Sequence, residues 1–430
     1  MQLQVLLCSK TFFVFVMHPG LKKEYATLVV IGGGAAGFFC AVNAARMNPS
    51  LKVIISEKSS KVLSKVKVSG GGRCNVTHAC FEIPELIKHY PRGQNFLKKS
   101  FHWFNTKDTI QWFEERGVTL KAEADGRMFP VTDTSQTIID CLIKEANKYE
   151  VEILFNTEIK SVKRINNFFQ LETTNNKLQT ANFLCIASGG YPKSSQFEWI
   201  KNLCHTIEEP VPSLFTFNIP HNNITSLMGV SVEKATVKIQ SSKLSETGPV
   251  LITHWGLSGP AVLKLSARGA RELNALGYNF SIFVNWLPLY NENTLRDKWF
   301  SLRKQFASQK ISNKNPFGLP QRLWLYFLNE CSINENGRWA DLSSTSQNKL
   351  IRTLTAQEFR VKGKTTFKEE FVTCGGVKLS EIDANTMQSK TVPNLFFAGE
   401  IMDVDGITGG FNFQHAWTSG WIAAKNIAIV

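Results

Sequence analysis

The feature that most restricts the fold is a strand, a glycine turn and a helix in direct succession near the N-terminus. The apolar run Thr27–Ile31 leads into GGGAAG and then into FFCAVNAARM, whose small and apolar residues recur at helical spacing. Gly32, Gly34 and Gly37 fill the G-x-G-x-x-G positions, which form the turn, admit a pyrophosphate and let the helix pack on its strand. A second apolar run ends at Glu57, where a carboxylate can accept hydrogen bonds from a ribose. This order predicts an α/β domain of the Rossmann type that binds a dinucleotide at a helix N-terminus.

A second glycine-rich stretch, VSGGGRCNVTHAC at residues 68–80, is open to three interpretations. A zinc site would need further ligands at short spacing, and the sequence offers no such cluster, so we expect no metal. A redox disulfide is the second interpretation, but the cysteine pair of flavin disulfide reductases is one residue closer together than Cys74 and Cys80. In the third, Gly70–Gly72 let the backbone lie against a cofactor and Arg73 neutralises its charge. We favour this cofactor loop and keep the disulfide as the alternative.

The C-terminal segment is predicted to return to the same cofactor. NLFFAGE is an apolar run that ends at Gly399 and Glu400, where a carboxylate can bind ribityl hydroxyls. DGITGGFN then offers Gly409–Gly410 before a helix that we expect to start near Phe413, and the N-terminus of such a helix can bind pyrophosphate or the edge of a flavin ring. A nicotinamide-binding domain alone would not need this distant return. The sequence therefore favours FAD over NAD as the tightly held cofactor.

The middle of the chain predicts an insertion into this domain. VEILFNTEI reads as a strand whose end, residues 157–159, can hold adenine through backbone groups, and ANFLCIASGG reads as another strand. From Tyr191 to about residue 290, short alternating runs such as VEKATVKIQ and NFSIFVNW are typical of a small β domain, and the spacing is then helical up to QNKLIRTLTAQEF. We expect an α/β fold in which an FAD-binding Rossmann-like domain, 27–190 and 365–430, carries an inserted β-barrel-like and helical domain, 191–364.

Three motifs together resemble one known family. KVKVSGGGRCNVT, the upstream VVIGGGAAG and the C-terminal NLFFAGEIMDVDGITGGFNFQHAWTSGW are similar to the YhiN-type family of FAD-dependent oxidoreductases, also called aminoacetone oxidase-like or BaiN-like. The resemblance runs from about Thr27 to the C-terminus. It implies a two-dinucleotide-binding-domain flavoprotein fold with an inserted domain. The chain departs from the family after YPK, where the usual glycine-rich run is missing.

The motifs and this resemblance assign a set of cofactor-binding residues. These are Gly32, Gly34, Ala35, Ala36, Gly37, Glu57, Lys58, Lys65, Ser69, Gly71, Gly72, Arg73, Cys74, Asn75, Ile159, Ala187, Ser188, Gly189, Gly399, Glu400, Asp403, Gly409, Gly410, Phe411 and Asn412. Flavin itself carries the hydride chemistry, so the protein must orient a substrate and stabilise charge near the ring.

Catalytic candidates come from family-like motifs expected near the flavin. Arg127 in DGRMFPV is the first, because an arginine can fix an anionic or carbonyl group with two hydrogen bonds, and His254 in THWGLSGPAVL is the second. A surface ion pair is the alternative for Arg127, and a structural histidine in a turn is the alternative for His254. Cys374 in TCGGV reads as a small buried filler.

The net charge limits the classes of partner that the chain can bind. The 430 residues carry 49 lysines and arginines against 35 acidic residues, and the net charge of +14 suits an anionic ligand, an acidic surface or nucleic acid. No basic stripe interleaved with aromatics stands out. We therefore favour a small-molecule substrate, with flavin reduced by NAD(P)H or by substrate, and rank a flavin-containing RNA-modifying protein below it, so that nucleic acid is not the expected partner.

The cysteines and the N-terminus indicate the compartment. Nine cysteines are scattered singly, which suits a reducing environment, and no apolar run is long enough to span a bilayer, so we expect a cytoplasmic protein without a membrane partner. The apolar opening MQLQVLLCSKTFFVFVM lacks a basic n-region and a cleavage site. We expect translation to start at Met17 rather than Met1.

We predict that the purified protein is yellow and holds FAD rather than FMN. The glycine turn and Glu57 are arranged for the pyrophosphate and the adenosine half of the cofactor, which FMN lacks. Chromatography of the flavin released by heat distinguishes the two. Release of FMN, or no bound flavin after reconstitution, contradicts the assignment.

Overall fold

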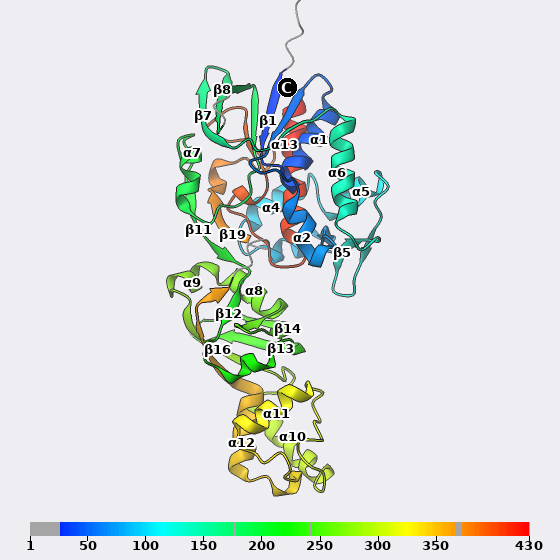
Figure 1. Ribbon diagram of the computed structural model, residues 1–430, viewed down its shortest axis with the longest axis vertical. Coiled ribbons are helices and arrows are strands. Elements are labelled where there is room, and N and C mark those ends of the chain that lie inside the picture. Colours follow the sequence, from blue (N-terminus) through cyan, green and yellow to red (C-terminus); the bar gives the residue numbers. More distant parts are fainter. Residues whose placement is uncertain (1–25, 175–177, 241, 366–371, 430) are drawn as a thin grey trace, which may run out of the picture.

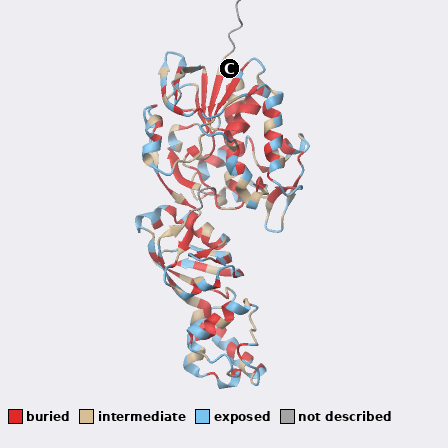
Figure 2. Cartoon of the chain, in the orientation of Figure 1, coloured by how far each residue is buried: buried red, intermediate tan, exposed pale blue. Residues whose placement is uncertain are grey.

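The computed structural model describes residues 26–174, 178–240, 242–365 and 372–429. The molecule is elongated, with a Rossmann domain at one end, a β-rich part in the middle and a group of helices at the other end (Figure 1). The middle and the helical end come from residues 214–365, which we call the inserted domain. Its buried side chains form a core of their own (Figure 2). The start expected at Met17 lies outside the described residues.

A five-stranded parallel sheet forms the centre of the Rossmann domain, in the order β20-β10-β1-β2-β6. Its central strand is buried on both faces, because helices cover one side of the sheet and a small antiparallel sheet covers the other (Figure 1). The strands are β1 Thr27–Ile31, β2 Lys52–Ser56, β6 Glu152–Leu154, β10 Phe183–Ile186 and β20 Leu395–Phe397; the small sheet holds β7 Ile159–Ile165, β8 Phe168–Thr173 and β9 Leu178–Ala181; the helices are α1 Ala35–Met47, α6 Gln136–Lys148 and α13 Phe411–Ala428. The predicted succession of strand, glycine turn, helix and strand is confirmed.

Two local predictions are wrong. The run VEILFNTEI forms two strands rather than one, since the chain turns at Asn156, whose φ is 50°, and β6 ends before this residue while β7 begins after it. Asparagine adopts this left-handed conformation more readily than most residues. The last helix starts at Phe411 and not near Phe413, because Gly410, with a φ of 92°, forms its N-cap.

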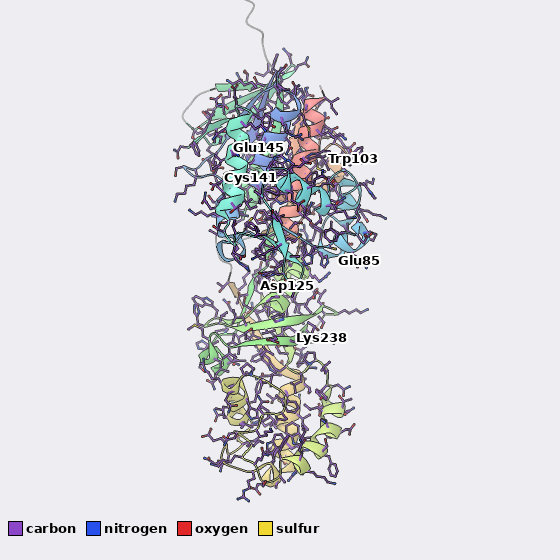
Figure 3. The ribbon with its side chains drawn as sticks, turned by 90° about the vertical axis from the view of Figure 1, so that its right-hand side faces the viewer. Glu85, Trp103, Asp125, Cys141, Glu145 and Lys238 are labelled. Atoms are coloured by element: carbon purple, nitrogen blue, oxygen red, sulfur yellow. The ribbon has the colours of Figure 1, made fainter. Side chains whose placement is uncertain are left out.

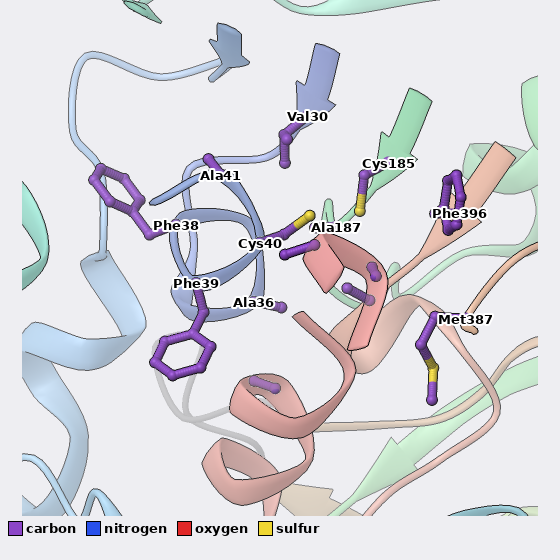
Figure 4. Close-up of a cluster of buried hydrophobic side chains, with 14 of the residues drawn as sticks. Val30, Ala36, Phe38, Phe39, Cys40, Ala41, Cys185, Ala187, Met387 and Phe396 are labelled. Atoms are coloured by element: carbon purple, nitrogen blue, oxygen red, sulfur yellow. The ribbon is translucent and has the colours of Figure 1, made fainter. Parts of the chain in front are cut away.

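Helices α1 and α13 pack side by side and hold the two ends of the Rossmann domain together. A Cβ at Gly420 of α13 would lie 2.7 Å from a carbonyl oxygen in the first turn of α1, so glycine permits this close approach. Phe39 of α1 contacts Trp417 of α13 with 5.2 Å between ring centroids. Figure 4 shows this part of the core, where Cys40 of α1 and Cys185 of β10 lie close together as free thiols. The packing keeps the C-terminal segment beside the first glycine turn.

The inserted domain is built on a seven-stranded antiparallel sheet, in the order β17-β16-β13-β14-β15-β12-β18. Only Gly363 separates the two edge strands in the sequence, so the sheet curls into a barrel-like shape whose apolar inner face packs against α8 and α12. Its strands are β12 Thr216–Asn218, β13 Ser231–Ile239, β14 Ser245–Ile252, β15 Gly256–Ser258, β16 Asn279–Asn285, β17 Gln357–Lys362 and β18 Lys364–Thr365; its helices are α8 Pro260–Arg268, α9 Ala270–Ala275, α10 Glu292–Gln305, α11 Gln321–Glu330 and α12 Ser344–Ala356. The domain contains a β-rich and a helical part, and the bounds expected from the sequence, 191–364, stay a prediction. The side chains of Phe197, Ile200 and Leu203 pack in the core of the Rossmann domain, and the core of the inserted domain begins at Phe215.

Shorter elements complete the two domains. They are helices α2 Ser64–Gly72, α3 Ile83–Leu86, α4 Gln94–Ser100, α5 Thr106–Glu114 and α7 Glu198–Lys201; strands β3 Thr77–His78, β4 Leu120–Ala122, β5 Arg127–Pro130, β11 Ile207–Ser213 and β19 Val372–Val377; and 3₁₀ turns η1 Ile87–His89, η2 Ser194–Phe197, η3 Asn223–Leu227, η4 Trp339–Asp341, η5 Leu379–Glu381 and η6 Gly399–Ile401. The antiparallel pair β11 and β19 connects the two domains. Across the described ranges, every helix is too short or too polar to cross a membrane.

Arg92 and Asp405 form a buried ion pair where the two domains meet. Asp405 is completely buried, and the hydroxyl of Ser213 at the end of β11 donates to its Oδ2 at 2.8 Å. Arg92 also donates from Nη1 to the carbonyl oxygen of Ala267 on α8, at 2.6 Å. The ion pair therefore joins the C-terminal segment, β11 and α8, the first helix of the inserted domain, at one point.

We predict that Asp405→Asn lowers the free energy of unfolding by about 3 kcal/mol, because it leaves the largely buried guanidinium of Arg92 without its counter-charge. Urea denaturation followed by circular dichroism measures the loss. The matched control is Glu85→Gln, which breaks an exposed pair with Lys88 and should cost less than about 1 kcal/mol. An Asp405→Asn protein as stable as the control would show that the pair does not hold the domains together.

Candidate functional site

The first glycine turn leaves an open space at the N-terminus of α1. Gly32 has a φ of 109°, and a Cβ there would lie 2.5 Å from the carbonyl oxygen of Ala187. A Cβ at Gly37 would lie 1.9 Å from the carbonyl oxygen of Gly32, so helix and strand touch at this point. Among the described residues, no atom lies within 4 Å of a Cβ at Gly34 and no side chain caps the helix. The first amides of α1 thus face free space of the kind that a pyrophosphate occupies.

Glu57 lies at the end of β2, beside this turn. Its Oε2 accepts from the backbone N–H of Gly33 at 2.8 Å, and its Oε1 accepts from that of Ser59 at 2.9 Å. Each oxygen has a second lone pair for a ribose hydroxyl. Next to it, Lys58 places its ammonium 5.9 Å from the ring centre of Tyr191. The carboxylate is therefore held in place before any ligand binds.

The two glycine loops predicted at the cofactor are brought together by Asn75. The helical part of α2 ends before Ser69, and Gly70–Gly72 all have positive φ values, between 58° and 84°. In the orientation of Asn75 that satisfies its amide, the side-chain oxygen accepts from the N–H of Gly410 at 2.9 Å and the nitrogen donates to the carbonyl oxygen of Thr77 at 3.0 Å. Segments far apart in the sequence thus form one surface in front of α13.

Arg73 and the two cysteines of the same stretch take other roles than a redox pair. The guanidinium of Arg73 donates to Glu123 at 2.5 Å and lies 4.0 Å from the ring centre of Phe129. Cys74 and Cys80 are both free, and burial raises the pKa of the Cys74 thiol to about 12. Its reactive thiolate is therefore scarce at neutral pH. These contacts give the disulfide alternative no support.

The C-terminal return places Glu400 against the first turn of α1. A Cβ at Gly399, whose φ is 76°, would lie 2.8 Å from the Cβ of Ala36. Glu400 accepts from the Lys65 ammonium at 2.7 Å and from the N–H of Thr373 at 2.9 Å. The hydroxyl of Thr373 is buried and has no partner among the described residues, as expected where a polar ligand completes the bonding. Open helix amides, glycine cradles and this hydroxyl together fit a dinucleotide cofactor.

Other predicted cofactor residues lie at the ends of strands or in the loops before helices, and their contacts with the cofactor stay predictions. Ile159 begins β7, and Ala187–Gly189 directly follow β10. Asn412 fixes the loop before α13, since its amide exchanges two hydrogen bonds with the backbone of Gly406, at 2.8 and 2.9 Å. Asp403 instead faces the inserted domain, where Arg271 lies 3.2 Å away, and burial raises the pKa of this carboxyl.

The catalytic candidates lie on three different elements. Arg127 at the start of β5 donates to Asp125 at 2.7 Å and to Glu123 at 3.0 Å, so its guanidinium is held by its own hairpin. His254 is exposed in the turn after β14, with its ring 4.1 Å from that of Trp255. Burial raises the pKa of Cys374 to about 11. Their roles stay predictions.

A cluster of three near-parallel rings was not predicted. His78 and His89 lie 4.7 and 4.3 Å from the ring of Phe411, the first residue of α13. Burial lowers the pKa of both imidazoles, that of His89 to about 4, and the positive charge of Lys264 on α8 contributes. The sequence analysis weighed the stretch that contains His78 as a metal site, a redox disulfide or a cofactor loop, but gave His78 no stacking role. Across the described ranges, no three His, Cys, Asp or Glu side chains are grouped to hold a metal ion.

The sequence pattern of the family described as HI0933-like protein Rossmann domain matches residues 26–426. The chain belongs to the HI0933-like family. Two relatives are ribosomal RNA dihydrouridine synthases, each 30% identical to this HI0933-like chain. That of Haemophilus influenzae aligns over 94% of this chain and 99% of its own length, and that of Escherichia coli K12 over 93% and 97%.

One more distant relative and one solved structure are also similar to this chain. A 3-dehydro-bile acid delta(4,6)-reductase of Clostridium scindens is 24% identical over 93% of this chain and 98% of its own. Among solved structures, 3-ketosteroid-delta4-(5alpha)-dehydrogenase from Rhodococcus jostii RHA1 has a TM-score of 0.51 at 12% identity, over 94% of this chain and 98% of that chain, and supports the fold alone. The predicted family, fold class and FAD cofactor are confirmed, and this HI0933-like protein is an FAD-dependent oxidoreductase.

We predict that Gly37→Ala and Gly34→Ala separate folding from cofactor binding. Gly37→Ala forces α1 away from β1, so it should lower the melting temperature of the cofactor-free protein and abolish retention of FAD. Gly34→Ala adds a methyl group only to the open space, so it should leave the cofactor-free melting temperature unchanged and weaken FAD binding about tenfold, or about 1.4 kcal/mol. Fluorescence titration with FAD measures both. Unchanged affinity in Gly34→Ala would place the cofactor elsewhere.

Proposed function

We propose that the chain reduces the carbon–carbon double bond of a uracil base in ribosomal RNA and so forms dihydrouridine. The observation that carries this proposal is the 30% identity to two ribosomal RNA dihydrouridine synthases over nearly the whole of both chains. The net charge of +14 supports a polyanionic substrate. Because of these two relatives, our proposal ranks RNA above the small molecule that the sequence analysis favours. A cytoplasmic location is part of the same proposal.

The reaction matches chemistry that a flavin supports. Uracil contains a carbon–carbon double bond conjugated to a carbonyl group, and such a bond accepts a hydride at the carbon β to the carbonyl and a proton at the α carbon. When bound and reduced by NAD(P)H, the flavin supplies the hydride. One NAD(P)H and one proton are consumed for each base reduced, and NAD(P)⁺ leaves.

The residues around the ring cluster have tasks that follow from their charge. The lowered pKa values keep His78 and His89 neutral at pH 7, so that these half-buried imidazoles, backed by the buried ring of Phe411, present planar, weakly polar surfaces to a base. Lys264 brings a positive charge to the same place for the adjoining phosphate. Arg127 and His254 stay our candidates for positioning the base, and in the case of Arg127 this requires exchange of its present carboxylate partners.

A small conjugated ketone is the second candidate substrate. The observation that favours it is the 24% identity to a 3-dehydro-bile acid delta(4,6)-reductase over almost the full length. This substrate class agrees with the small-molecule preference of the sequence analysis. The two candidates share the reduction and differ in how the substrate is held, because only RNA engages many cations at once.

We predict that FAD-loaded protein with NADPH converts uridine in a ribosomal RNA transcript to dihydrouridine. Transcripts made in vitro carry no modification, so mass spectrometry of the digested RNA detects the added hydrogens directly. Omission of NADPH is the control. If a conjugated ketone reoxidises the reduced flavin anaerobically while the transcripts are left unchanged, the small-molecule candidate replaces RNA.

A further inference from the structure

The positive charge of the chain is concentrated in the inserted domain. Residues 214–365 contain 19 lysines and arginines against 9 acidic residues, an excess of 10 out of the total of +14. The rest of the chain, which builds the cofactor site, has an excess of only 4. The charge therefore does not serve the FAD phosphates, which bind in the nearly balanced Rossmann domain.

The strand register gathers part of this charge around an aromatic ring. Lys238 of β13 lies directly opposite Phe283 of β16, and Phe283 lies opposite Glu358 of β17. Arg360 is opposite Ser281 and thus diagonal to Phe283, and Lys362 follows on the same face of β17. Cations of β13 and β17 stand about 10 Å apart across the strand between them. Thr236, Thr247 and Asn285 extend this face with uncharged polar groups.

This outer face is open to solvent. The helices that contact the sheet pack on its inner, apolar face, and Lys238, Arg360 and Lys362 are exposed. Phe283 is partly exposed between them. Across the described part of the chain, none of these three cations has a carboxylate partner. In Figure 3, Lys238 lies on the strands below the part of the Rossmann domain that carries Asp125.

A groove adjoins the same strand at its other end. Lys234 of β13, Leu289, Tyr290 and Phe317 are among the residues that line a hollow of about 600 Å³ between the sheet and the helical end. Tyr290 and Phe317 are partly exposed, while Leu289 is 82% exposed. One lysine and two partly exposed rings thus continue from the sheet face into the groove, which Glu233 also lines.

We propose that the outer face of β13, β16 and β17 is an RNA-binding surface, on which Lys238, Arg360 and Lys362 hold phosphates and Phe283 stacks on an unpaired base. Sheets that bind single-stranded RNA use this combination of strand-borne rings and cations. The face is too polar for a membrane or for an apolar protein partner, and its unpaired cations complement a polyanion. The inference rests on the proposed RNA substrate and names the part of the protein that holds it outside the reaction site.

Holding the RNA at a distance from the flavin has a catalytic use. Binding energy from groups that do not react can position the reacting base and offset the cost of unstacking it. The cofactor domain, with its small charge excess, then needs to recognise only one base and its adjoining phosphate. This explains why the charge and the cofactor lie in different domains.

The test compares charge variants of the full-length, FAD-loaded protein. The variant Lys238→Gln/Arg360→Gln/Lys362→Gln should bind a fluorescent ribosomal RNA transcript at least about tenfold more weakly and lower the slope of log affinity against log salt by about two to three. The control Lys98→Gln/Lys107→Gln/Lys163→Gln removes as much charge from exposed positions of the Rossmann domain and should keep most of the affinity. Phe283→Leu should weaken binding several-fold with an unchanged salt slope, because it removes stacking and not charge.

Two results would contradict the proposed RNA-binding surface. The first would also contradict the RNA substrate, and the second would not. If the parent protein binds the transcript without salt dependence, or not at all, the RNA substrate fails together with the surface. If the parent binds RNA and forms dihydrouridine while the sheet variant and the control behave alike, only the surface fails. Flavin content and the rate of flavin reduction by NADPH should be the same in all variants, which confirms that each is folded.

Discussion

The first turn of α1 is the contact on which the rest of the structure depends. Gly37 lets this turn lie directly against Gly32 at the end of β1, and Gly32 in turn lies against Ala187 at the end of β10. Gly399 and Gly420 let the C-terminal segment reach the same turn of α1 from the other side. A side chain at any of these positions would meet backbone or Cβ atoms at less than 3 Å. The space left free by Gly34 exists only because these contacts fix its walls. The cofactor site is therefore a product of backbone packing more than of particular side chains.

Much of this arrangement could be predicted from the sequence because its determinants are local. About 30 consecutive residues contain β1, the glycine turn, α1, β2 and Glu57 in this order. Each glycine of the turn is required there for a steric reason. The failures are local as well. Asn156 breaks an apolar run that has no proline or glycine to signal the turn, and Gly410 caps α13 earlier than the hydrophobic spacing of the helix indicates.

Features that depend on long-range contacts could not be predicted in this way. No stretch of sequence shows a basic and aromatic stripe, yet strand register places Lys238, Phe283 and Arg360 together although more than 120 positions separate the first from the last. The ring cluster likewise joins residues of β3, η1 and α13. Such groupings arise from pairing and packing, which a pattern of residue types along one segment does not encode.

The inserted domain leaves the Rossmann domain through β11 and returns through β19, and these two strands are hydrogen-bonded neighbours. The ends of the insertion are thus about 5 Å apart, the distance between paired strands. A module joined in this way can be replaced by a different one, or by a short turn, without moving the sheet that holds the cofactor. Members of one family can then keep the same redox centre and change only the inserted module. Such a change is a simple route from one class of substrate to another.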